Sequence, residues 1–528
     1  MHPFSICLSL LFALPAYIIF LLFSRLVRRR LYLAEAARRG CQDAPLEPSN
    51  LPFGIDRLRS SLKEDRKQLF PNFMADRFSE MGVSTFRFTG IAGNDGYVTY
   101  DPKNIQALLA TQFHDFGLGT QRRGNFFPLL GNGIFTLDGK GWEHSRAMMR
   151  PQFAREQVSD LELEETHVQN LMRALPVGAE GWTDPTDLQV LFFRLTLDSA
   201  TEFLFGESIE SQIAELPAHP GVARTNEQNR GEKDFASAFD LSQRWLATRS
   251  RFQDKYWLIS SREFRSASKV CHRFVDHFVQ SALHPELKGP NLEKGTREKY
   301  VFLEALATQT RDPVELRSQM LNILLAGRDT TASLLGWLFY ILVRDTRVFE
   351  KLRMTILDAF GTFNDPKEIT FARLKACQYL QWCLSETLRL YPVVPINSRQ
   401  ALKDTTIPRG GGPDGQSPVL IKKGQRVGYS VYVMHRAKEY WGDDAKEFKP
   451  ERWEKARPQF TYLPFNGGPR ICIGQQFALT EVSYVAVRLL QRFDKLENLD
   501  TDPVVRHNLT LTNSSGTGVK IRMRQAKA

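Results

Sequence analysis

One cysteine stands in a segment whose neighbours could support thiolate chemistry. The segment Phe465–Gly474 reads Phe-Asn-Gly-Gly-Pro-Arg-Ile-Cys-Ile-Gly, and its cysteine is Cys472. The thiolate is the form of cysteine that ligates metals. Gly468 and Gly474 allow backbone N–H groups to approach the sulfur, which lowers its pKa, and Arg470 can donate to an anionic group. The segment therefore predicts a metal-ligating thiolate, whereas most lone cysteines are small buried apolar residues.

A second segment places an acid next to a hydroxyl group inside a predicted helix. Residues 313–344 form a long apolar-rich run that begins with proline, which predicts a helix, and Ala-Gly-Arg-Asp-Thr-Thr occupies residues 326–331. Glycine, aspartate and paired threonines are poor helix formers. Small residues would let a flat cofactor approach the helix, and a threonine hydroxyl can open its backbone hydrogen bonds. An acid beside an alcohol, at Asp329 and Thr330, predicts a proton relay.

Two further pairs have helical spacing. Glu386 and Arg389 stand at i and i+3, and Trp142 and Arg146 stand at i and i+4. Arg452 follows later in the chain, within Phe-Lys-Pro-Glu-Arg-Trp. Taken alone, such pairs are typical of solvated ion pairs and surface cation–π contacts. They indicate a functional site only in combination with the segments above.

The pattern around the cysteine, Phe-x-x-Gly-x-Arg-x-Cys-x-Gly, resembles the haem-binding signature of the cytochrome P-450 monooxygenases, and all five defined positions are filled. The resemblance implies haem b (iron protoporphyrin IX) as the cofactor and Cys472 as the axial ligand of its iron. A thiolate ligand pushes electron density onto bound oxygen and favours O–O cleavage. The resemblance also implies that Phe465, Arg470 and Gly474 bind the cofactor, with Arg470 reaching a propionate.

The other segments resemble the remaining motifs of this family, in the family's order. Residues 326–331 resemble its oxygen-binding helix, which implies catalytic roles: Asp329 relays protons from solvent and Thr330 orients the bound oxygen. Three residues resemble a buried structural triad that holds the cysteine loop, namely Glu386, Arg389 and Arg452. Three more resemble donors to the haem propionates, namely Trp142, Arg146 and Arg399. His144, on the helix of Trp142, is expected to be exposed and not a ligand.

Three strings allow a narrower comparison. Residues 326–332, 395–399 and 474–481 resemble the fungal alkane and fatty-acid ω-hydroxylases, and Ile473, where that group commonly has leucine, is a conservative departure. The resemblance implies that an apolar substrate is hydroxylated with O₂, and we expect ω-hydroxylation of long-chain fatty acids or n-alkanes. The electrons would come from NADPH through NADPH-cytochrome P-450 reductase, with cytochrome b5 as a further candidate donor.

Three alternatives stay open, because these strings lie near the cofactor and not near the substrate. One is a hydroxylase dedicated to a fungal terpenoid or polyketide pathway. A haem-thiolate isomerase, which needs no reductase, is disfavoured because Asp329 and Thr330 are retained. A non-enzymatic haem sensor or carrier is disfavoured by the same motif and by the basic charge of the chain. The candidate pocket residues, which could equally be core, are Phe126, Phe127, Leu129, Ile134, Leu325, Val393 and Val394.

The elements that must position these residues follow from composition and periodicity. The chain has 528 residues, 42% hydrophobic and 24% charged, which is enough for a large core, and no linker or repeat divides it after residue 70. Strand patterns occur at 85–88, 96–100 and about 419–433, and helical spacing dominates after residue 100. We therefore predict a mainly α fold with small β-sheets, the cytochrome P-450 fold that the resemblance implies. The predicted domains are a membrane anchor at 1–24, a basic, proline-punctuated connector at 25–70 and a catalytic domain at 71–528.

The first residues predict an N-terminal transmembrane helix. Phe4–Phe23 contains no charge, and Arg25, Arg28, Arg29 and Arg30 follow it. About 20 apolar residues span a bilayer, and a basic flank on one side predicts that this side faces the cytosol. A cleaved signal peptide is disfavoured because the positive charge follows the apolar run and no Ala-x-Ala site is present. We expect a single-pass protein of the endoplasmic reticulum membrane with a cytosolic catalytic domain.

The net charge of +11 has two ordinary explanations. Basic residues near the anchor favour anionic lipid, and a basic face attracts an acidic electron-donor protein. No nucleic-acid-reading motif accompanies the charge, so a nucleic-acid partner is not expected. The six cysteines lack Cys-x-x-Cys spacing, which speaks against a disulfide framework or a zinc site and fits a reducing compartment.

Overall fold

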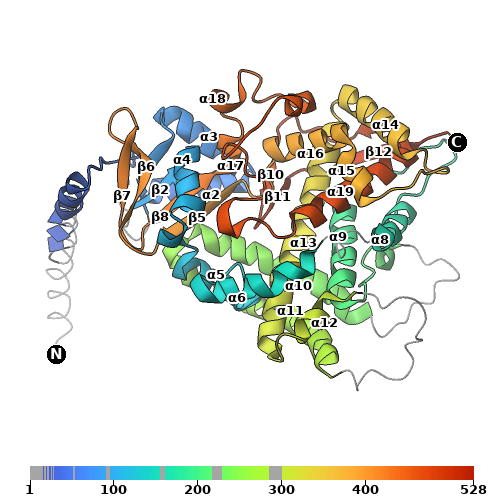
Figure 1. Cartoon of the computed structure of the whole chain (residues 1–528), viewed down its shortest axis with the longest axis horizontal. Helices are drawn as coiled ribbons and strands as arrows, with labels where there is room; N and C mark the ends of the chain where they lie inside the picture. The colour runs from blue at the N-terminus through green and yellow to red at the C-terminus, as the bar shows by residue number, and fades with distance from the viewer. Residues whose placement is uncertain are drawn as a thin grey trace, which may run out of the picture.

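In the described residues the chain folds into helices with four small sheets, and the sequence predicts a mainly α fold with small sheets (Figure 1). The computed structural model describes residues 16, 19–20, 23–24, 26–27, 29–51, 54–90, 95–154, 161–216, 229–284 and 300–527. The α-helices are α2 (Ile55–Arg66), α3 (Phe70–Met81), α4 (Pro102–Gln106), α5 (Gly119–Leu130), α6 (Gly139–Met149), α8 (Leu161–Arg173), α9 (Leu188–Phe205), α10 (Asn229–Arg251), α11 (Arg262–Leu283), α12 (Phe302–Ala307), α13 (Pro313–Leu342), α14 (Thr346–Phe360), α15 (Phe371–Ala376), α16 (Gln378–Leu390), α17 (Val431–Met434), α18 (Lys438–Trp441) and α19 (Gln475–Arg492).

Strands of the largest sheet and the β6–β7 hairpin lie at one side of the molecule, and β12 lies at the other (Figure 1). Figure 1 shows β2, β5, β6, β7 and β8 at the left, beside the helical body. The largest sheet has the order β1-β2-β8-β5-β3, the second has β4-β12-β9, and β6-β7 and β10-β11 form hairpins. The strands are β1 (Thr85–Thr89), β2 (Asp95–Thr99), β3 (Phe116–Gly117), β4 (Thr186–Asp187), β5 (Ile396–Ala401), β6 (Thr405–Gly411), β7 (Ser417–Ile421), β8 (Arg426–Ser430), β9 (Phe493–Asn498), β10 (His507–Leu509), β11 (Asn513–Ser515) and β12 (Lys520–Gln525).

Helix α13 runs through the centre of the helical body (Figure 1). It begins where the proline predicts, because Asp312 caps it by accepting a hydrogen bond from the Val314 N–H. Its residues belong to both large hydrophobic clusters, one shared with α9, α14, α16 and α19 and the other with α5, α10 and α11. A helix buried all round is apolar on every face, so the polar residues in its middle need specific partners.

The predicted strand patch at 419–433 divides into separate elements. It contains most of β7, all of β8 and the first residues of helix α17. Gly424, with φ +87°, makes the turn between the two strands, and the Ser430 hydroxyl accepts a hydrogen bond from the Val433 N–H and starts α17. The apolar residues of this patch therefore extend beyond strand β8 into helix α17, which begins after the cap at Ser430.

The N-terminal residues that the structure describes join the folded body. Residues 29–38 are helical, Gln42 donates its N–H to the Pro418 carbonyl, and Leu46 bridges to Arg87 of β1. The domain limits drawn from the sequence at residues 24 and 70 stay predictions. In the described part of the chain no helix is long and apolar enough to cross a membrane. Most of the predicted anchor, Phe4–Phe23, lies outside the described residues.

Candidate functional site

The cysteine segment forms a tight loop that leads into helix α19. The Cys472 N–H donates to the Phe465 carbonyl (N···O 3.0 Å), and the 3₁₀ turn Gly468–Arg470 lies between them. Gly468 has φ +67°, and a Cβ there would collide with the carbonyl oxygen of Leu109, so this position requires glycine. From the sequence, glycine at 468 is expected to give backbone N–H groups access to the sulfur. The structure shows instead that Gly468 packs closely against the backbone of Leu109.

Opposing influences act on the pKa of the Cys472 thiol. The side chain is exposed, yet protein surrounds it, and burial raises the pKa of the thiol. A hydrogen bond from the Gly474 N–H acts in the opposite direction, followed by the positive charge of Arg146. A thiol with a backbone donor and a cation directed at it can be stabilised as a thiolate. We propose that this atom is the metal ligand.

Arginines gather near this loop without enough carboxylates to balance them. Arg470 donates to Asp138 (Nη2···Oδ1 2.7 Å) and to the Leu137 carbonyl, and its guanidinium lies over the Trp142 ring at 4.4 Å. Burial, together with the charges of Arg399 and Arg146, lowers the pKa of Arg470 to about 10, although the charge of Asp138 acts against this. The Nε of Arg470 is buried without a hydrogen-bond partner. In the described part of the chain Asp138 is the carboxylate that pairs with these arginines.

Arg122 of α5 belongs to the same group, although no motif pointed to it. Burial, followed by the charge of Arg399, lowers its pKa to about 10. Its Nη2 donates to the Asn397 side chain (2.6 Å), which carries no charge. Uncompensated buried cations are costly unless an anion binds. The Cys472 thiol and the group of four arginines, Arg122, Arg146, Arg399 and Arg470, therefore fit a haem. Its iron takes a thiolate, and its propionates are anionic. The residues that would hold it are Trp142, Arg146, Arg399, Arg470, Arg122 and Cys472.

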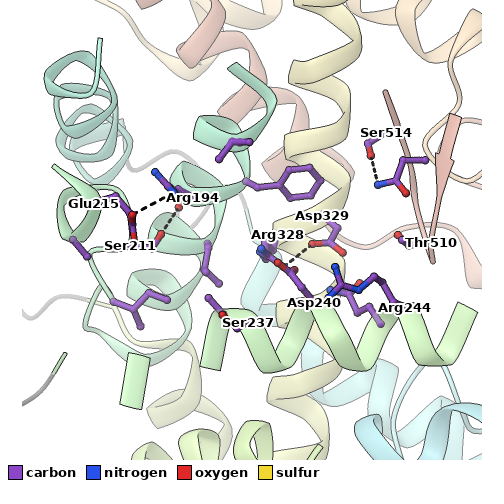
Figure 2. A pocket seen from close by; sticks show the side chains of 18 residues that line it. Arg194, Ser211, Glu215, Ser237, Asp240, Arg244, Arg328, Asp329, Thr510 and Ser514 are labelled. Atoms are coloured by element: carbon purple, nitrogen blue, oxygen red, sulfur yellow. Dashed lines mark hydrogen bonds and ion pairs between the residues drawn. The ribbon is translucent and has the colours of Figure 1, made fainter. Parts of the chain in front are cut away.

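Residues in the middle of α13 line two different cavities. The Thr330 hydroxyl donates to the Ala326 carbonyl (2.6 Å), and Thr330, Ala326 and Leu325 line a cavity of about 780 Å³. Arg328 and Asp329 line a different cavity of about 520 Å³ (Figure 2). A Cβ at Gly327 would lie 3.8 Å from the side chain of Ala200, so this glycine faces α9. Asp329 and Thr330 are adjacent in sequence, but they line different cavities.

The larger cavity joins apolar and basic side chains. At α13 its lining includes the buried Leu325 and the half-buried Ala326 and Thr330, whereas near α2 its lining includes the exposed residues Asn50 and Ser60. Of the seven candidate pocket residues, Phe126, Leu325 and Val394 line it. The other four do not line either described cavity; Leu129 and Val393 are buried in core clusters, Ile134 packs against one, and Phe127 is 48% exposed.

The predicted triad is present and buried. Glu386 of α16 is fully buried and accepts from Arg389 (Nη2···Oε1 2.8 Å) and from Arg452 (Nε···Oε1 2.8 Å). Trp453 Nε1 and the Lys449 N–H also donate to it, each at 3.0 Å. One carboxylate therefore satisfies two arginines out of contact with water.

His435 connects α16 to the loop before the cysteine, and no sequence motif indicates this role. Its Nε2 accepts from the Leu463 N–H (2.8 Å), and its Nδ1 faces the Arg389 carbonyl at 3.2 Å. Burial lowers the pKa of His435 to about 3, so the ring is neutral and can accept. Tyr462 adds a second link by donating to the Ser385 carbonyl (3.0 Å). These contacts fix the segment that precedes Phe465.

Other sequence expectations can also be compared with the structure. His144 is 61% exposed and contacts Glu315 (Nε2···Oε1 2.9 Å), as expected for a residue outside the site. Arg399 of β5 is buried and lies over the Tyr429 ring. The five described cysteines are free.

Comparison with known proteins settles the family. The model of the family described as "Cytochrome P450" matches residues 86–520. The chain belongs to the cytochrome P450 family. Cytochrome P450 monooxygenase g430 of Fusarium sp is 55% identical over 518 residues, which is 97% of this chain and 90% of that protein. Cytochrome P450 monooxygenase alt2 of Alternaria solani is 46% identical over 531 residues, 97% of this chain and 96% of that protein. Cytochrome P450 52A12 of Debaryomyces hansenii is 49% identical over 489 residues, 92% of each chain.

Membership confirms the main expectations from sequence. The chain is an oxidoreductase of the cytochrome P450 monooxygenase family, whose members bind haem. Its fold is the mainly helical cytochrome P450 fold with small sheets. Members of this family in eukaryotes generally take electrons from a reductase and act on apolar substrates. The roles of individual residues in this cytochrome P450 stay proposals.

Proposed function

We propose that this cytochrome P450 hydroxylates the terminal carbon of long-chain fatty acids or n-alkanes, with haem b held by Cys472. Haem with a thiolate ligand supplies the cleavage of O₂, and the protein supplies binding, orientation and protons. NADPH-cytochrome P-450 reductase would deliver the electrons, with cytochrome b5 as a further donor. The membrane anchor would hold the catalytic domain on the cytosolic face of the endoplasmic reticulum.

The observation that carries the substrate proposal is the larger cavity, which is lined by apolar side chains at its α13 end and by arginines at its α2 and α3 end. Leu325, Ala326, Phe126 and Leu511 line it near Thr330. Arg122 also lines the cavity and lies over the Phe126 ring at 5.3 Å. A terminal CH₃ has a stronger C–H bond than the adjacent CH₂, so ω-hydroxylation depends on positioning alone. An apolar end lined by bulky side chains favours presentation of only the chain terminus. The volume of about 780 Å³ is within the range of pockets that enclose ligands of this size.

The basic end of the cavity suits a carboxylate. Arg57 of α2 and Arg77 of α3 both pair with the buried carboxylate of Glu47, and Arg77 also pairs with Glu80 (Nη1···Oε2 2.9 Å). Burial, followed by the charge of Arg77, lowers the pKa of Arg57 to about 9. The Nε of Arg57 has no hydrogen-bond partner, and its guanidinium lies over Phe88 at 4.7 Å. A fatty-acid carboxylate would accept a hydrogen bond from this Nε.

The experiment compares hexadecanoic acid with n-hexadecane, each assayed with the purified enzyme and its reductase. We expect the ω-alcohol as the main product from both. Arg57→Gln should weaken the type I spectral response to the acid about tenfold and leave the response to the alkane unchanged, because an uncharged chain makes no contact with the guanidinium. Equal weakening for both ligands would show that Arg57 only supports the shape of the cavity.

A hydroxylase of a terpenoid or polyketide pathway is the second candidate. The cavity is also large enough for a compact polycyclic substrate, and the names of the Fusarium and Alternaria relatives state no substrate. A panel that includes terpenoids separates the two proposals. Efficient oxidation of a polycyclic compound without turnover of fatty acids or alkanes would favour this second function.

A further inference from the structure

The β6–β7 hairpin carries three consecutive glycines that play no part in the candidate site. Residues 408–415 read Pro-Arg-Gly-Gly-Gly-Pro-Asp-Gly. A Cβ at Gly411 would lie 2.6 Å from the carbonyl oxygen of Gln42, and a Cβ at Gly412 would collide with the side-chain oxygen of the same residue. Side chains at these two positions are therefore excluded by a segment near the N-terminus.

This segment is bonded to the hairpin through its backbone. The Gln42 N–H donates to the Pro418 carbonyl (N···O 2.9 Å), and the Gly412 N–H donates to the Asp43 carbonyl (3.2 Å). The segment and the hairpin each donate one bond and accept one. Residues 42–43 therefore extend the hydrogen bonding of the hairpin and fill the space that the glycines leave.

The helical residues 29–38 lie beside the same hairpin (Figure 1). The Tyr32 hydroxyl donates to the Leu420 carbonyl of β7 (2.9 Å) and lies 3.2 Å from the Tyr97 hydroxyl of β2. Ala36, Cys41 and Leu420 form a small buried cluster in which each residue is at most 5% exposed. A tyrosine ring bonded at its polar end, next to a buried apolar cluster, fixes these helical residues against the hairpin.

Ion pairs connect the helical residues to the largest sheet. Arg29 pairs with Asp43, and its guanidinium lies over the Tyr32 ring at 5.1 Å. Arg87 of β1 pairs with the same Asp43 (Nε···Oδ2 3.2 Å) and with Asp95 of β2 (Nη1···Oδ2 3.0 Å). The four charged side chains are between 12% and 30% exposed, so salt screens them less than it screens a surface pair.

The backbone that leaves the hairpin leads directly to the lining of the larger cavity. The Arg87 N–H donates to the Pro45 carbonyl, and the Glu47 N–H donates to the Arg87 carbonyl, both at 2.9 Å. The Glu47 carboxylate pairs with Arg57 and Arg77, and all three residues line the cavity. Arg57, which the proposed function assigns to the substrate carboxylate, is therefore attached to this segment.

We propose that Gly411 and Gly412 form a cradle that docks residues 29–47 on the catalytic domain, and that this docking fixes the α2 and α3 end of the substrate cavity relative to the membrane anchor. The membrane part of this inference rests on the proposed function, which places the anchor immediately before the docked segment. The partner that the cradle fits is thus the membrane-proximal segment of the chain itself.

Docking has a consequence for substrate uptake. The ends of a flexible chain as long as residues 29–47 would be separated by a distance that varies around roughly 20–25 Å. The docked segment removes this freedom, because both its helical residues and its extended residues are bonded to the sheets. Long apolar chains partition into lipid, so a cavity held in one orientation beside the bilayer receives them from the lipid phase.

The first test measures the docking itself and needs neither membrane nor substrate. Hydrogen exchange at the Gln42 and Glu47 amides of the full-length holoenzyme is followed by mass spectrometry. Gly412→Ala should speed this exchange about tenfold, because its Cβ displaces Gln42. Gln42→Ala in the same chain should restore protection, because the colliding side chain is gone.

The hairpin offers a matched control. Gly412 has φ +78° and Gly415 has φ +66°, but a Cβ at Gly415 would meet no atom within 4 Å. Gly415→Ala therefore adds the same kind of backbone strain without the collision, and its exchange should equal that of wild type. Tyr32→Phe, which leaves the hairpin unchanged, should also speed the exchange of the segment, because it removes the bond to Leu420.

The second test measures orientation on a membrane. The holoenzyme is placed in oriented bilayers of phosphatidylcholine and phosphatidylserine, and polarised absorption of the haem band reports the tilt of the haem plane. Wild type and Gly415→Ala should show strong dichroism, and Gly412→Ala should lose most of it. In vesicles of the same lipids Gly412→Ala should raise KM for hexadecanoic acid and leave kcat unchanged, whereas in detergent micelles it should equal wild type.

Three results would overturn the proposal. Wild-type exchange in Gly412→Ala, or no rescue by Gln42→Ala, would show that the glycines do not form a cradle for this segment. Strong dichroism in a Gly412→Ala protein with fast exchange would show that docking does not set the orientation. A wild-type chain that fails to bind the bilayers would remove the anchor and the orientation together. Failure of hexadecanoic acid as a substrate would overturn the proposed function and leave the exchange and the dichroism intact.

Discussion

Replacing Glu386 by glutamine should strongly destabilise the protein, because one carboxylate serves five hydrogen bonds. Two come from Arg389, and one each comes from Arg452, Trp453 and the Lys449 N–H. Arg389 and Glu386 are both fully buried. Glutamine keeps one acceptor oxygen and turns an amide towards guanidinium donors, so it loses the charge and adds a repulsive contact.

The magnitude follows from the burial of the arginines. Breaking a buried ion pair by removing one partner costs about 3–5 kcal/mol, because the remaining charge is left uncompensated. Arg389 still donates to the His435 and Ala445 carbonyls, and Arg452 still reaches Asp444, which limits the loss. We therefore expect a loss of about 4 kcal/mol in the free energy of unfolding, roughly a thousandfold in the folded-to-unfolded ratio. With an unfolding entropy of about 2.1 cal/mol/K per residue, the Tm of the chain falls by roughly 4 °C.

The assay is thermal unfolding followed by circular dichroism, together with haem content per protein. The matched control is Asp443→Asn, which breaks a pair with Lys438 whose carboxylate is fully exposed, and its Tm should equal that of wild type. The haem content of Glu386→Gln should also fall, because α16 holds the segment before the cysteine through Tyr462 and His435. A Tm within about 1 °C of wild type with full haem content would refute the reasoning, since it lies well outside the expected shift.

Three further predictions concern the site and its placement. Thr330→Ala should keep haem and substrate binding but divert NADPH electrons into hydrogen peroxide, because the hydroxyl that orients the proton is lost; unchanged product per NADPH would transfer the role to another group, such as Thr331. Gly468→Ala should lower haem content and Tm, because its Cβ would collide with the Leu109 carbonyl, and a wild-type melting curve would contradict this. Asn508 and Asn513 both begin glycosylation patterns but should be unmodified in a cytosolic domain, and Asn513 is also fully buried; a glycosidase-sensitive mass shift at either would overturn the proposed orientation.

Part of the candidate site could be predicted from the sequence because it depends on residues that are close together in the chain. The spacing of Glu386 and Arg389 and the proline at the start of α13 are short-range features that local patterns indicate, whereas Gly468 is required by its packing against the distant Leu109. The family resemblance then connected segments that lie far apart in the chain. The structure brings Arg452 to Glu386 across 66 positions, which no local pattern predicts.

The remaining features depend on tertiary contacts without a sequence period. Arg122 joins the arginine group only because α5 lies beside β5, where Asn397 receives its hydrogen bond. Asp240 pairs with Arg328 only because α10 packs near α13; the two residues are 88 positions apart in the chain. Leu129 and Val393 were as plausible for the pocket as Phe126 and Val394, since apolar side chains on a helix or loop do not reveal which way they face.

In the proposed site, Cys472 provides the thiolate ligand of the haem iron. The most direct test is the difference spectrum of the reduced, CO-bound protein for wild type, Cys472→Ser and the control Cys377→Ser, a buried cysteine outside the site. We predict the red-shifted Soret band of a thiolate complex in wild type and in Cys377→Ser, and its loss in Cys472→Ser while much of the circular dichroism persists. A red-shifted band that survives in Cys472→Ser would contradict the assignment.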